Sequence, residues 1–240
     1  ANGFVGRALV RRLVADPSVI VCAATRHPGE ALAPGVPRTV LAELGPDTDW
    51  RPALQGVDVV VHLAARVHVM QETSADPWAE FHRVNVQGAL HLARQAAQAG
   101  VRRLVFVSSI KVNGERTLPG VFFGADDVPA PEDPYGRSKQ EAEERLRELA
   151  CASSLEVVVV RPPLVYGPGV QANFSQLMRA VARGWPLPLG AVNNRRSFLA
   201  LDNLVDLLLL CASHPAAANQ IFLASDGQDL STCQLVQRMA

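Results

Sequence analysis

The sequence predicts an α/β fold built on a doubly wound parallel sheet, and three observations lead to this fold class. Short apolar runs of strand length alternate along the chain with longer amphipathic segments of helical period. Two of these runs, 57–65 and 157–160, are almost entirely apolar, which is typical of parallel strands buried on both faces. The chain also opens on a Gly-x-x-Gly directly before an amphipathic segment. In such a fold, right-handed crossovers place ligands at the carboxyl ends of the strands.

The composition is that of an ordinary globular protein. Of the 240 residues, 48% are hydrophobic and 19% are charged, enough to bury the core of one large domain or somewhat more. The formal net charge is zero, so we expect neither nucleic acid nor an anionic membrane as a partner. No apolar run approaches the roughly 18 residues of a membrane span. The four cysteines lack metal-ligand spacing, so we expect reduced core thiols, no metal site and a cytoplasmic protein.

The first segment has the features of half a dinucleotide-binding fingerprint. Gly3 and Gly6 open a predicted helix over 7–15, and a predicted strand over 19–24 follows. Glycines in such a loop let the backbone approach a diphosphate, which then lies on the helix N-terminus. The first glycine and the first strand would precede Ala1, so we expect the sequence to be truncated there. Alone, the glycine pair is also compatible with an ordinary turn.

The next segments continue the strand and helix alternation. Strands are predicted over 39–43 and 57–65, and the second ends on Ala64 and Ala65, which are small enough to let a flat ligand approach.

A helix is predicted from Asp76, as the N-cap, to a stop at Gly100. Asn85 is an amide on its core-facing stripe. It either supports a ligand site or simply bridges backbone groups.

The segment that carries the most chemistry follows the strand predicted over 103–107. Ser109 lies at the carboxyl end of this strand. A helix is predicted over 135–149, and its first two turns contain Tyr135 and Lys139. The chain contains two tyrosines and two lysines, and this pair has the four-residue spacing that puts both side chains on one helical face. We expect the ammonium to lower the pKa of the phenol, as general acid–base catalysis requires. A bare Tyr-x-x-x-Lys also fits an exposed amphipathic helix.

We expect the whole chain to be divided at residue 161, into a sheet domain over 1–161 and a smaller lobe over 162–240 that is interleaved with the sheet. Residues 162–169 are expected to form a rigid loop rich in proline and glycine. Further elements are predicted over 174–183, 196–201, 202–212, 221–225 and 230–240. The Arg195-Arg196 pair suits an anionic phosphate, although a solvated surface pair is equally compatible with the sequence.

Six motifs in this order resemble the extended short-chain dehydrogenase/reductase family, and more narrowly its NAD(P)-dependent nucleotide-sugar epimerases, dehydratases and reductases. The resemblance covers essentially the whole chain and implies a Rossmann-type domain with a smaller C-terminal substrate lobe. The motifs are Asn2-Gly3-Phe4-Val5-Gly6, His62-Leu63-Ala64-Ala65, Asn85-Val86-Gln87-Gly88, Val107-Ser108-Ser109, Tyr135-x-x-x-Lys139 and Arg161-Pro162.

The resemblance implies roles for individual residues. Tyr135 would be the acid/base, Ser109 would orient the sugar oxygen, and Lys139 would hold the nicotinamide ribose and lower the pKa of Tyr135. The cofactor, NAD or NADP, would contact Gly3, Phe4, Gly6, Arg26, Glu43, Leu44, Leu63, Ala64, Ala65, Lys139 and Pro162, with Asn85 supporting them from behind. The substrate would contact Ser109, Asn113, Asn173, Leu187, Pro188 and Arg196.

Two departures from the family pattern carry information. The 4,6-dehydratases of this family have an Asp-Glu pair after the catalytic Ser or Thr, but this chain has Ile110 and Lys111, so we exclude that reaction. NAD-preferring relatives have an acid at the end of the second strand, whereas this chain has Arg26, which could pair with the 2′-phosphate of NADP.

The resulting hypothesis is a UDP-hexose 4-epimerase that uses a tightly held NAD. An NADPH-dependent reductase of a UDP-4-keto-6-deoxy-hexose, serving surface polysaccharide synthesis, is the close alternative. A non-catalytic NAD(P)-sensing regulator is the alternative of another class. Family members are often homodimers through paired helices, so a homodimer is also expected.

Overall fold

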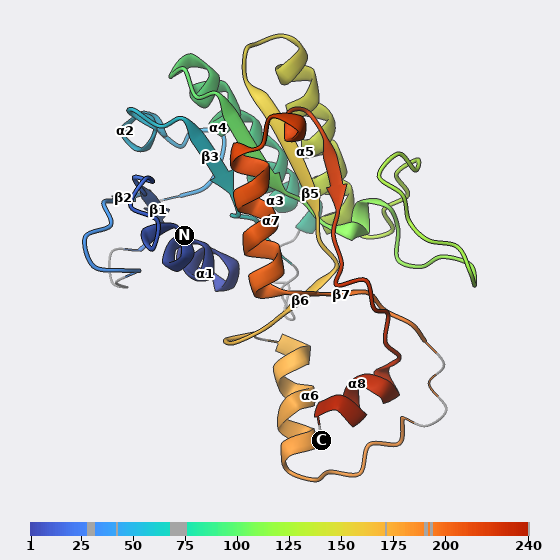
Figure 1. Ribbon diagram of the computed structural model, residues 1–240. Coiled ribbons are helices and arrows are strands. Elements are labelled where there is room, and N and C mark those ends of the chain that lie inside the picture. Colours follow the sequence, from blue (N-terminus) through green and yellow to red (C-terminus); the bar gives the residue numbers. More distant parts are fainter. Residues whose placement is uncertain are drawn as a thin grey trace.

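The computed structural model describes residues 1–27, 32–41, 43–67, 76–170, 172–189, 192 and 194–239, without the side chains of residues 172 and 173. Figure 1 shows a central sheet with helices on both faces and, beyond the carboxyl ends of the strands, a smaller part that carries α6 and α8.

The strands and helices follow the predicted alternation. The strands are β1 (Ala23–Thr25), β2 (Arg38–Val40), β3 (Val59–His62), β4 (Arg103–Val107), β5 (Glu156–Arg161), β6 (Leu164–Tyr166), β7 (Phe198–Ala200) and β8 (Ile221–Leu223). The helices are α1 (Phe4–Val14), α2 (Arg51–Leu54), α3 (Pro77–Phe81), α4 (Gly88–Gln98), α5 (Pro134–Cys151), α6 (Ala172–Ala182), α7 (Leu201–Ser213) and α8 (Thr232–Met239).

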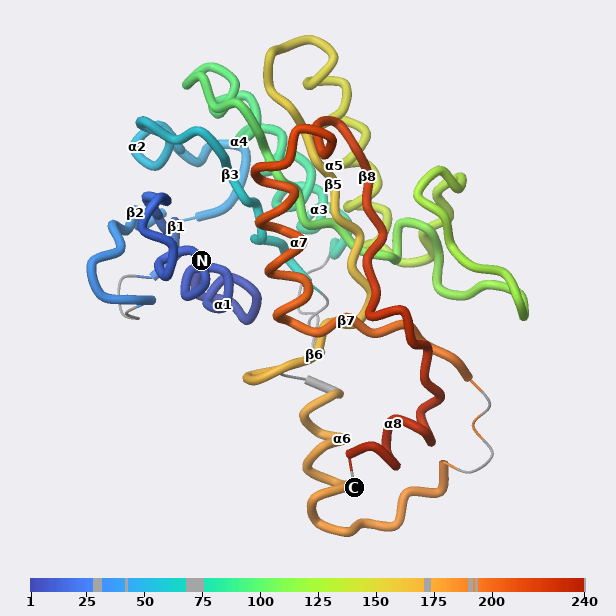
Figure 2. The backbone as a smooth tube through the Cα atoms, viewed as in Figure 1, coloured from blue at the N-terminus to red at the C-terminus, as the bar shows by residue number. Residues whose placement is uncertain are grey.

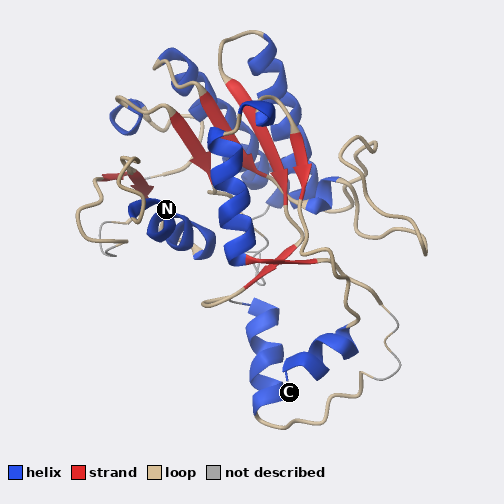
Figure 3. Ribbon diagram, viewed as in Figure 1, coloured by secondary structure: helices blue, strands red, loops and turns tan. Residues whose placement is uncertain are grey.

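Four strands form the main sheet, in the order β3-β4-β5-β8, and all neighbouring pairs are parallel. Parallel pairs β1-β2 and β6-β7 flank it as separate ladders. Figure 3 shows the four strands of the main sheet as one layer between helices. The predicted α/β fold with a parallel central sheet is therefore confirmed.

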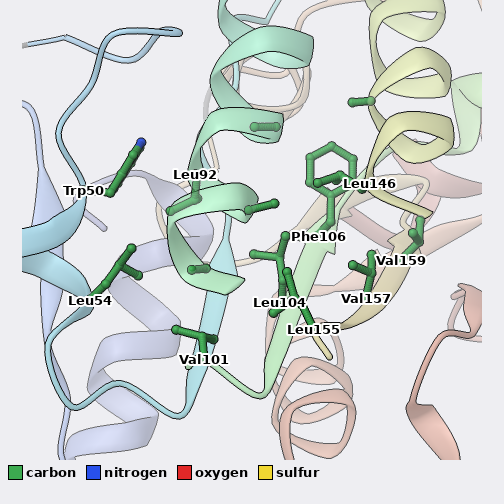
Figure 4. Packing of buried hydrophobic residues seen from close by; sticks show 14 of the residues in the cluster. Trp50, Leu54, Leu92, Val101, Leu104, Phe106, Leu146, Leu155, Val157 and Val159 are labelled. Carbon is green, nitrogen blue, oxygen red and sulfur yellow. The ribbon is translucent and has the colours of Figure 1, made fainter. Parts of the chain in front are cut away.

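Both faces of the sheet are covered, which explains why its strands are apolar throughout. Leu104 and Phe106 of β4 pack into a cluster with α2, α4 and α5, whereas Val105 between them packs into a second cluster with α1 and α7. Figure 4 shows Phe106 beside Leu146 of α5 in the first cluster. Because successive side chains of a strand point to opposite faces, a strand between two helical layers needs apolar residues at every position.

Several boundaries differ from the sequence prediction. The strand predicted over 19–24 begins only at Ala23, and Ile20 is 91% exposed. The strand predicted over 39–43 is Arg38–Val40. Within the predicted loop 162–169, residues Leu164–Tyr166 form β6, because Phe198–Ala200 of β7 pairs with them.

The helix predicted between Asp76 and Gly100 is confirmed as α3 and α4 joined by a π-helical segment, His82–Gln87. The Asp76 carboxylate accepts a hydrogen bond from the Ala79 amide at 3.0 Å, as expected of an N-cap. The π-helical segment turns Asn85 into the protein, where it is 1% exposed.

The C-terminal third of the chain contributes to both parts of the protein. Helix α7 covers the sheet and β8 extends it, whereas α6 and α8 contact each other in the smaller lobe. In Figure 2 the chain leaves the sheet after β5, returns through α7 and β8, and leaves it again before α8.

The cysteines correct one expectation, since Cys22 and Cys151 are exposed and Cys211 is buried. Within the described ranges, no helix is long and apolar enough to cross a membrane. No group of three or more His, Cys, Asp or Glu side chains in the same ranges could hold a metal ion.

Candidate active site

The first turn of α5 sets the position of Tyr135. The Asp133 carboxylate caps this helix by accepting a hydrogen bond from the Gly136 amide at 2.6 Å. A Cβ atom at Gly136 would lie 2.9 Å from the carbonyl oxygen of Lys111, so the helix packs closely on the turn that follows β4. Glycine is required at this position because any side chain would separate the two segments.

Ser109 belongs to that turn and is held next to the helix. The Ile110 amide donates to the Pro162 carbonyl at 3.0 Å, which ties the turn to the end of β5. The Ser109 hydroxyl accepts from the Lys111 amide at 3.3 Å, and Ser109 lies near enough to the Tyr135 phenol to lower its pKa. The structure thus brings together the two hydroxyl groups that the sequence predicts to act on one substrate oxygen.

The protonation of Tyr135 differs from the expectation. Burial, with the nearby charge of Asp133, raises the pKa of the phenol to about 12, although Lys111 and Ser109 lower it. The predicted lowering is therefore wrong for this state of the protein. The cation that acts on the phenol is Lys111, whereas Lys139 is not among the groups that shift this pKa.

Lys139 is instead fixed against the end of β4. Its side chain is 2% exposed, its Nζ donates to the Val107 carbonyl at 2.8 Å, and it lies 4.3 Å from the centre of the Phe106 ring. Burial lowers the pKa of this ammonium to about 7, while the charge of Glu143 opposes the shift. A cation held in this way has little freedom to move away from the site.

His62 lies beside Lys139 at this edge of the sheet, and the sequence analysis names it in a motif without giving its side chain a role. Its ring stacks on Phe106 at a centroid distance of 5.9 Å, and burial together with the charge of Lys139 lowers the pKa of His62 to about 3. The imidazole is therefore neutral. The available signal was a single histidine in an otherwise apolar strand.

Asn85 supports the catalytic helix from behind. Its amide nitrogen donates to the Ser138 hydroxyl at 2.9 Å and to the Arg66 carbonyl at 3.0 Å, while its oxygen accepts from the Arg66 amide at 2.8 Å. The Ser138 hydroxyl in turn donates to the Tyr135 carbonyl at 2.7 Å. These bonds connect the segment after β3 to the first turn of α5.

The N-terminus of α1 has the features expected of a diphosphate site. Gly3 is its N-cap, with no side-chain hydrogen bond and open space where a Cβ atom would be. A Cβ atom at Gly6 would overlap the carbonyl of Ala1, which explains the need for glycine. Phe4 is partly buried at the first position of the helix, and Arg26, just after β1, is exposed.

The other predicted cofactor residues differ in burial and in the groups that they contact. Glu43 is exposed and forms an ion pair with Arg83 at 2.5 Å, whereas Leu44 packs on the core. Leu63 packs against the α1 and α7 cluster. Ala64 and Ala65 follow β3 and are partly buried, and Pro162 is buried directly after β5.

Asn113 does not have the position that a substrate contact requires. It is 3% exposed, its oxygen accepts from Arg161 Nη1 at 3.0 Å, and its nitrogen donates to the Gly124 carbonyl at 2.7 Å. Arg161 also forms a buried ion pair with Glu143, with Nη2 and Oε2 2.6 Å apart. Asn113 therefore holds the loop after β4 in place, and this structural role replaces the expected substrate contact.

The remaining predicted substrate residues lie in the smaller lobe. Leu187 is partly buried and Pro188 is exposed. Arg196 is exposed, and its backbone pairs with Leu230 just before β7. The side chain of Asn173 lies outside the described residues.

The family can now be assigned. The sequence model of the NAD-dependent epimerase/dehydratase family matches residues 1–224. The chain belongs to this family. A curated relative, a UDP-glucose 4-epimerase of Vibrio cholerae, is 49% identical over 244 residues, which cover 100% of this chain and 73% of the relative.

Other relatives show the range of this family. A 2-alkyl-3-oxoalkanoate reductase of Stenotrophomonas maltophilia is 30% identical over 99% of this chain and 72% of the relative. Among solved structures, MoeE5 in complex with UDP-glucose and NAD superposes with a TM-score of 0.83 at 30% identity, covering 99% of this chain and 78% of MoeE5.

The residues of this family member fit NAD. An uncapped helix N-terminus with glycine at its start can take a diphosphate, and the buried ammonium of Lys139 is a hydrogen-bond donor at the carboxyl edge of the same sheet. Both features lie where an open α/β sheet binds its ligands.

Proposed function

We propose that the protein is an NAD-dependent 4-epimerase of a nucleotide-linked hexose, and specifically of a UDP-hexose. The observation that carries the proposal is the placement of Ser109 next to the Tyr135 phenol, with the side chain of Lys139 fixed at the end of the same strand. The strong similarity to the Vibrio cholerae enzyme supports UDP as the nucleotide and C4 as the reacting carbon.

Each residue of the site has one task in this reaction. When bound, NAD would supply the hydride chemistry at C4, the oxidation of the sugar and the reduction of the keto-sugar on its opposite face. Ser109 holds the C4 oxygen by a hydrogen bond, and Tyr135 exchanges a proton with the same oxygen. With a pKa of about 12, Tyr135 is a neutral phenol at pH 7, the form that donates the proton during reduction. Oxidation requires the phenolate, so the pKa must fall when the substrate and the cofactor are bound.

The smaller lobe would bind the nucleotide and the diphosphate. Arg196 is an exposed guanidinium just before β7, which suits bidentate binding of a phosphate. Asn173, Leu187 and Pro188 would contact the nucleotide. A 4,6-dehydratase reaction is not proposed, because Lys111 stands where that reaction needs an acid and its ammonium is paired with Glu115 and Asp133.

The test is the interconversion of UDP-glucose and UDP-galactose by the purified protein, with no net change in cofactor. Tyr135→Phe should retain the bound cofactor and lose about 100-fold or more of the rate. Arg196→Ala should weaken selective binding of UDP. Failure to interconvert any UDP-hexose, by protein that does contain NAD, would refute the proposal.

A reductase that consumes NADPH is the second candidate, and Arg26 is the observation that favours it. This exposed guanidinium follows β1, where it could pair with the 2′-phosphate of NADP. Stoichiometric loss of NADPH with a UDP-4-keto-6-deoxy-hexose would establish this activity.

A non-catalytic sensor would be indicated only if Tyr135→Phe kept the full biological effect. The cytoplasmic location and the homodimer remain predictions, for fractionation and light scattering.

A further inference from the structure

Lys111 forms two ion pairs at the edge of the active site. Its Nζ lies 2.5 Å from Asp133 Oδ2 and 2.8 Å from Glu115 Oε1. Burial alone would lower the pKa of Lys111, but the hydrogen bonds with Asp133 and Glu115 raise it above its usual value. Lys111 is therefore a cation at neutral pH, and both of its partners are carboxyl side chains.

These contacts join the two segments that carry the reacting hydroxyls. The backbone amide of Lys111 donates to the Ser109 hydroxyl, while its side chain pairs with Asp133, the N-cap of α5. Tyr135 is the second residue of this helix, and the close approach of Gly136 to the Lys111 carbonyl adds a backbone contact. One residue therefore contacts the Ser109 turn through its backbone and the Tyr135 helix through its side chain.

The charges of Lys111 and Asp133 both act on the pKa of the Tyr135 phenol. Among the described residues, the ones that shift its pKa are Asp133 from the segment before α5, and Lys111 and Ser109 from the turn after β4. From α3, the apolar ring of Phe81 packs on Tyr135 at 6.3 Å, and the guanidinium of Arg66 lies over that ring at 5.7 Å. The phenol thus meets one carboxylate, which raises its pKa, and one ammonium, which has the smaller and opposite effect.

We propose that Lys111 is a positioning residue for the reaction: its ion pair with Asp133 clamps the Ser109 turn to the Tyr135 helix and balances the charge that the phenol meets. The inference rests on the proposed function only for the role of Tyr135 as the acid/base. Removing Lys111 leaves the Asp133 charge unbalanced and disfavours the phenolate. Removing the charge of Asp133 leaves the Lys111 cation and favours the phenolate.

The test reads the ionisation of Tyr135 directly. The chain contains two tyrosines, so protein labelled with ¹³C at the tyrosine Cζ gives two signals, which the Tyr166→Phe variant assigns. From a pKa of about 12, roughly a tenth of Tyr135 is phenolate at pH 11. A shift of about one unit brings this fraction to about a hundredth in Lys111→Met. Asp133→Asn is made in the Lys111→Arg background, because arginine stays charged at pH 11, and there the fraction should rise to about a half.

The control variants separate charge from structure. Asn is a good N-cap, so Asp133→Asn keeps the helix start, and Lys111→Arg keeps the charge and should titrate like the wild type. The double variant Lys111→Met/Asp133→Asn should return towards the wild-type fraction. Circular dichroism shows up to which pH each variant stays folded. The phenolate fractions are then compared at one pH, the highest at which every variant is folded.

The two shifts must have opposite signs. Equal signs, or no shift in either variant, would overturn the proposal, because a merely structural contact would not produce a mirrored pair. This titration needs no substrate, so it decides the role of Lys111 even if the protein does not interconvert UDP-hexoses. In an active protein, the apparent pKa in the pH profile of kcat should shift in the same direction as the pKa of Tyr135 in each variant, with little change in KM.

Discussion

Replacing Lys139 with methionine should stabilise the protein at neutral pH while it abolishes activity. Lys139 is 2% exposed, and burial lowers its pKa from 10.5 to about 7. Methionine has a similar length and carries no charge, so it can occupy the same space beside Phe106 without the cost of desolvating an ammonium.

The size of the effect follows from the difference between the folded and unfolded pKa values. Above pH 10.5 Lys139 is neutral in both the folded and the unfolded protein, so its burial carries no cost of desolvating a charge. Below pH 7 it is charged in both states and the full cost applies, an upper value of about 5 kcal/mol at 1.36 kcal/mol per unit. Between these limits the wild type gains stability as the pH rises. The advantage of Lys139→Met should therefore shrink by about 3 kcal/mol between pH 7 and pH 9.5.

The assay is urea denaturation of wild type and Lys139→Met, freed of bound nucleotide, at pH 7 and pH 9.5. Lys139→Arg is the matched control, because arginine stays charged throughout this range and should lose stability at both pH values. A difference between wild type and Lys139→Met that is the same at both pH values would refute the reasoning. It would mean that Lys139 carries its charge in the folded protein as readily as in the unfolded chain.

Three further substitutions test other contacts. Glu143→Gln leaves the buried charge of Arg161 without its partner, and urea denaturation should show a loss of about 3–5 kcal/mol, whereas replacing both residues by apolar ones should cost less. Gly136→Ala puts a Cβ atom 2.9 Å from the Lys111 carbonyl, so the stability should fall by about 1–3 kcal/mol and kcat should fall with it, whereas an unchanged kcat would contradict the close approach. Arg26→Glu should reduce the affinity for NADPH relative to NADH about tenfold or more, as measured by fluorescence titration, and equal affinities would show that Arg26 does not meet the 2′-phosphate.

The fold could be predicted from the sequence wherever burial on both faces leaves a continuous apolar run. Strands β3, β4 and β5 are of this kind, and their predicted positions are confirmed with small changes at the ends. Strands β1 and β6 depend on a partner elsewhere in the chain. Each has three residues, and pairing decides which three. Such a strand has no periodicity of its own to read, which explains both errors.

The site could be predicted in its reacting groups but not in its supporting contacts. Ser109 and Tyr135 come together because one ends a strand and the other begins a helix at the same sheet edge, which is a consequence of topology. The roles of Asn113 and of the Arg161–Glu143 ion pair depend on which side chains meet inside the folded protein. Residues that are 48 and 18 positions apart in the chain give no local pattern for such contacts.

The pKa of Tyr135 was predicted wrongly for the same reason, because it depends on which side chains meet in the folded protein. Its raised value also bears on how the site works. Four-residue spacing places Lys139 on the same helical face as Tyr135, but it does not say where a long flexible side chain directs its charge. Here the Lys139 ammonium bonds to the Val107 carbonyl and stacks on Phe106, while burial keeps the phenol protonated. A protein that kept a permanent phenolate in an apolar site would pay a large desolvation cost in every resting molecule. A neutral phenol whose pKa falls only when the substrate and the cofactor bind avoids this cost, and it confines the reactive base to the complex that uses it.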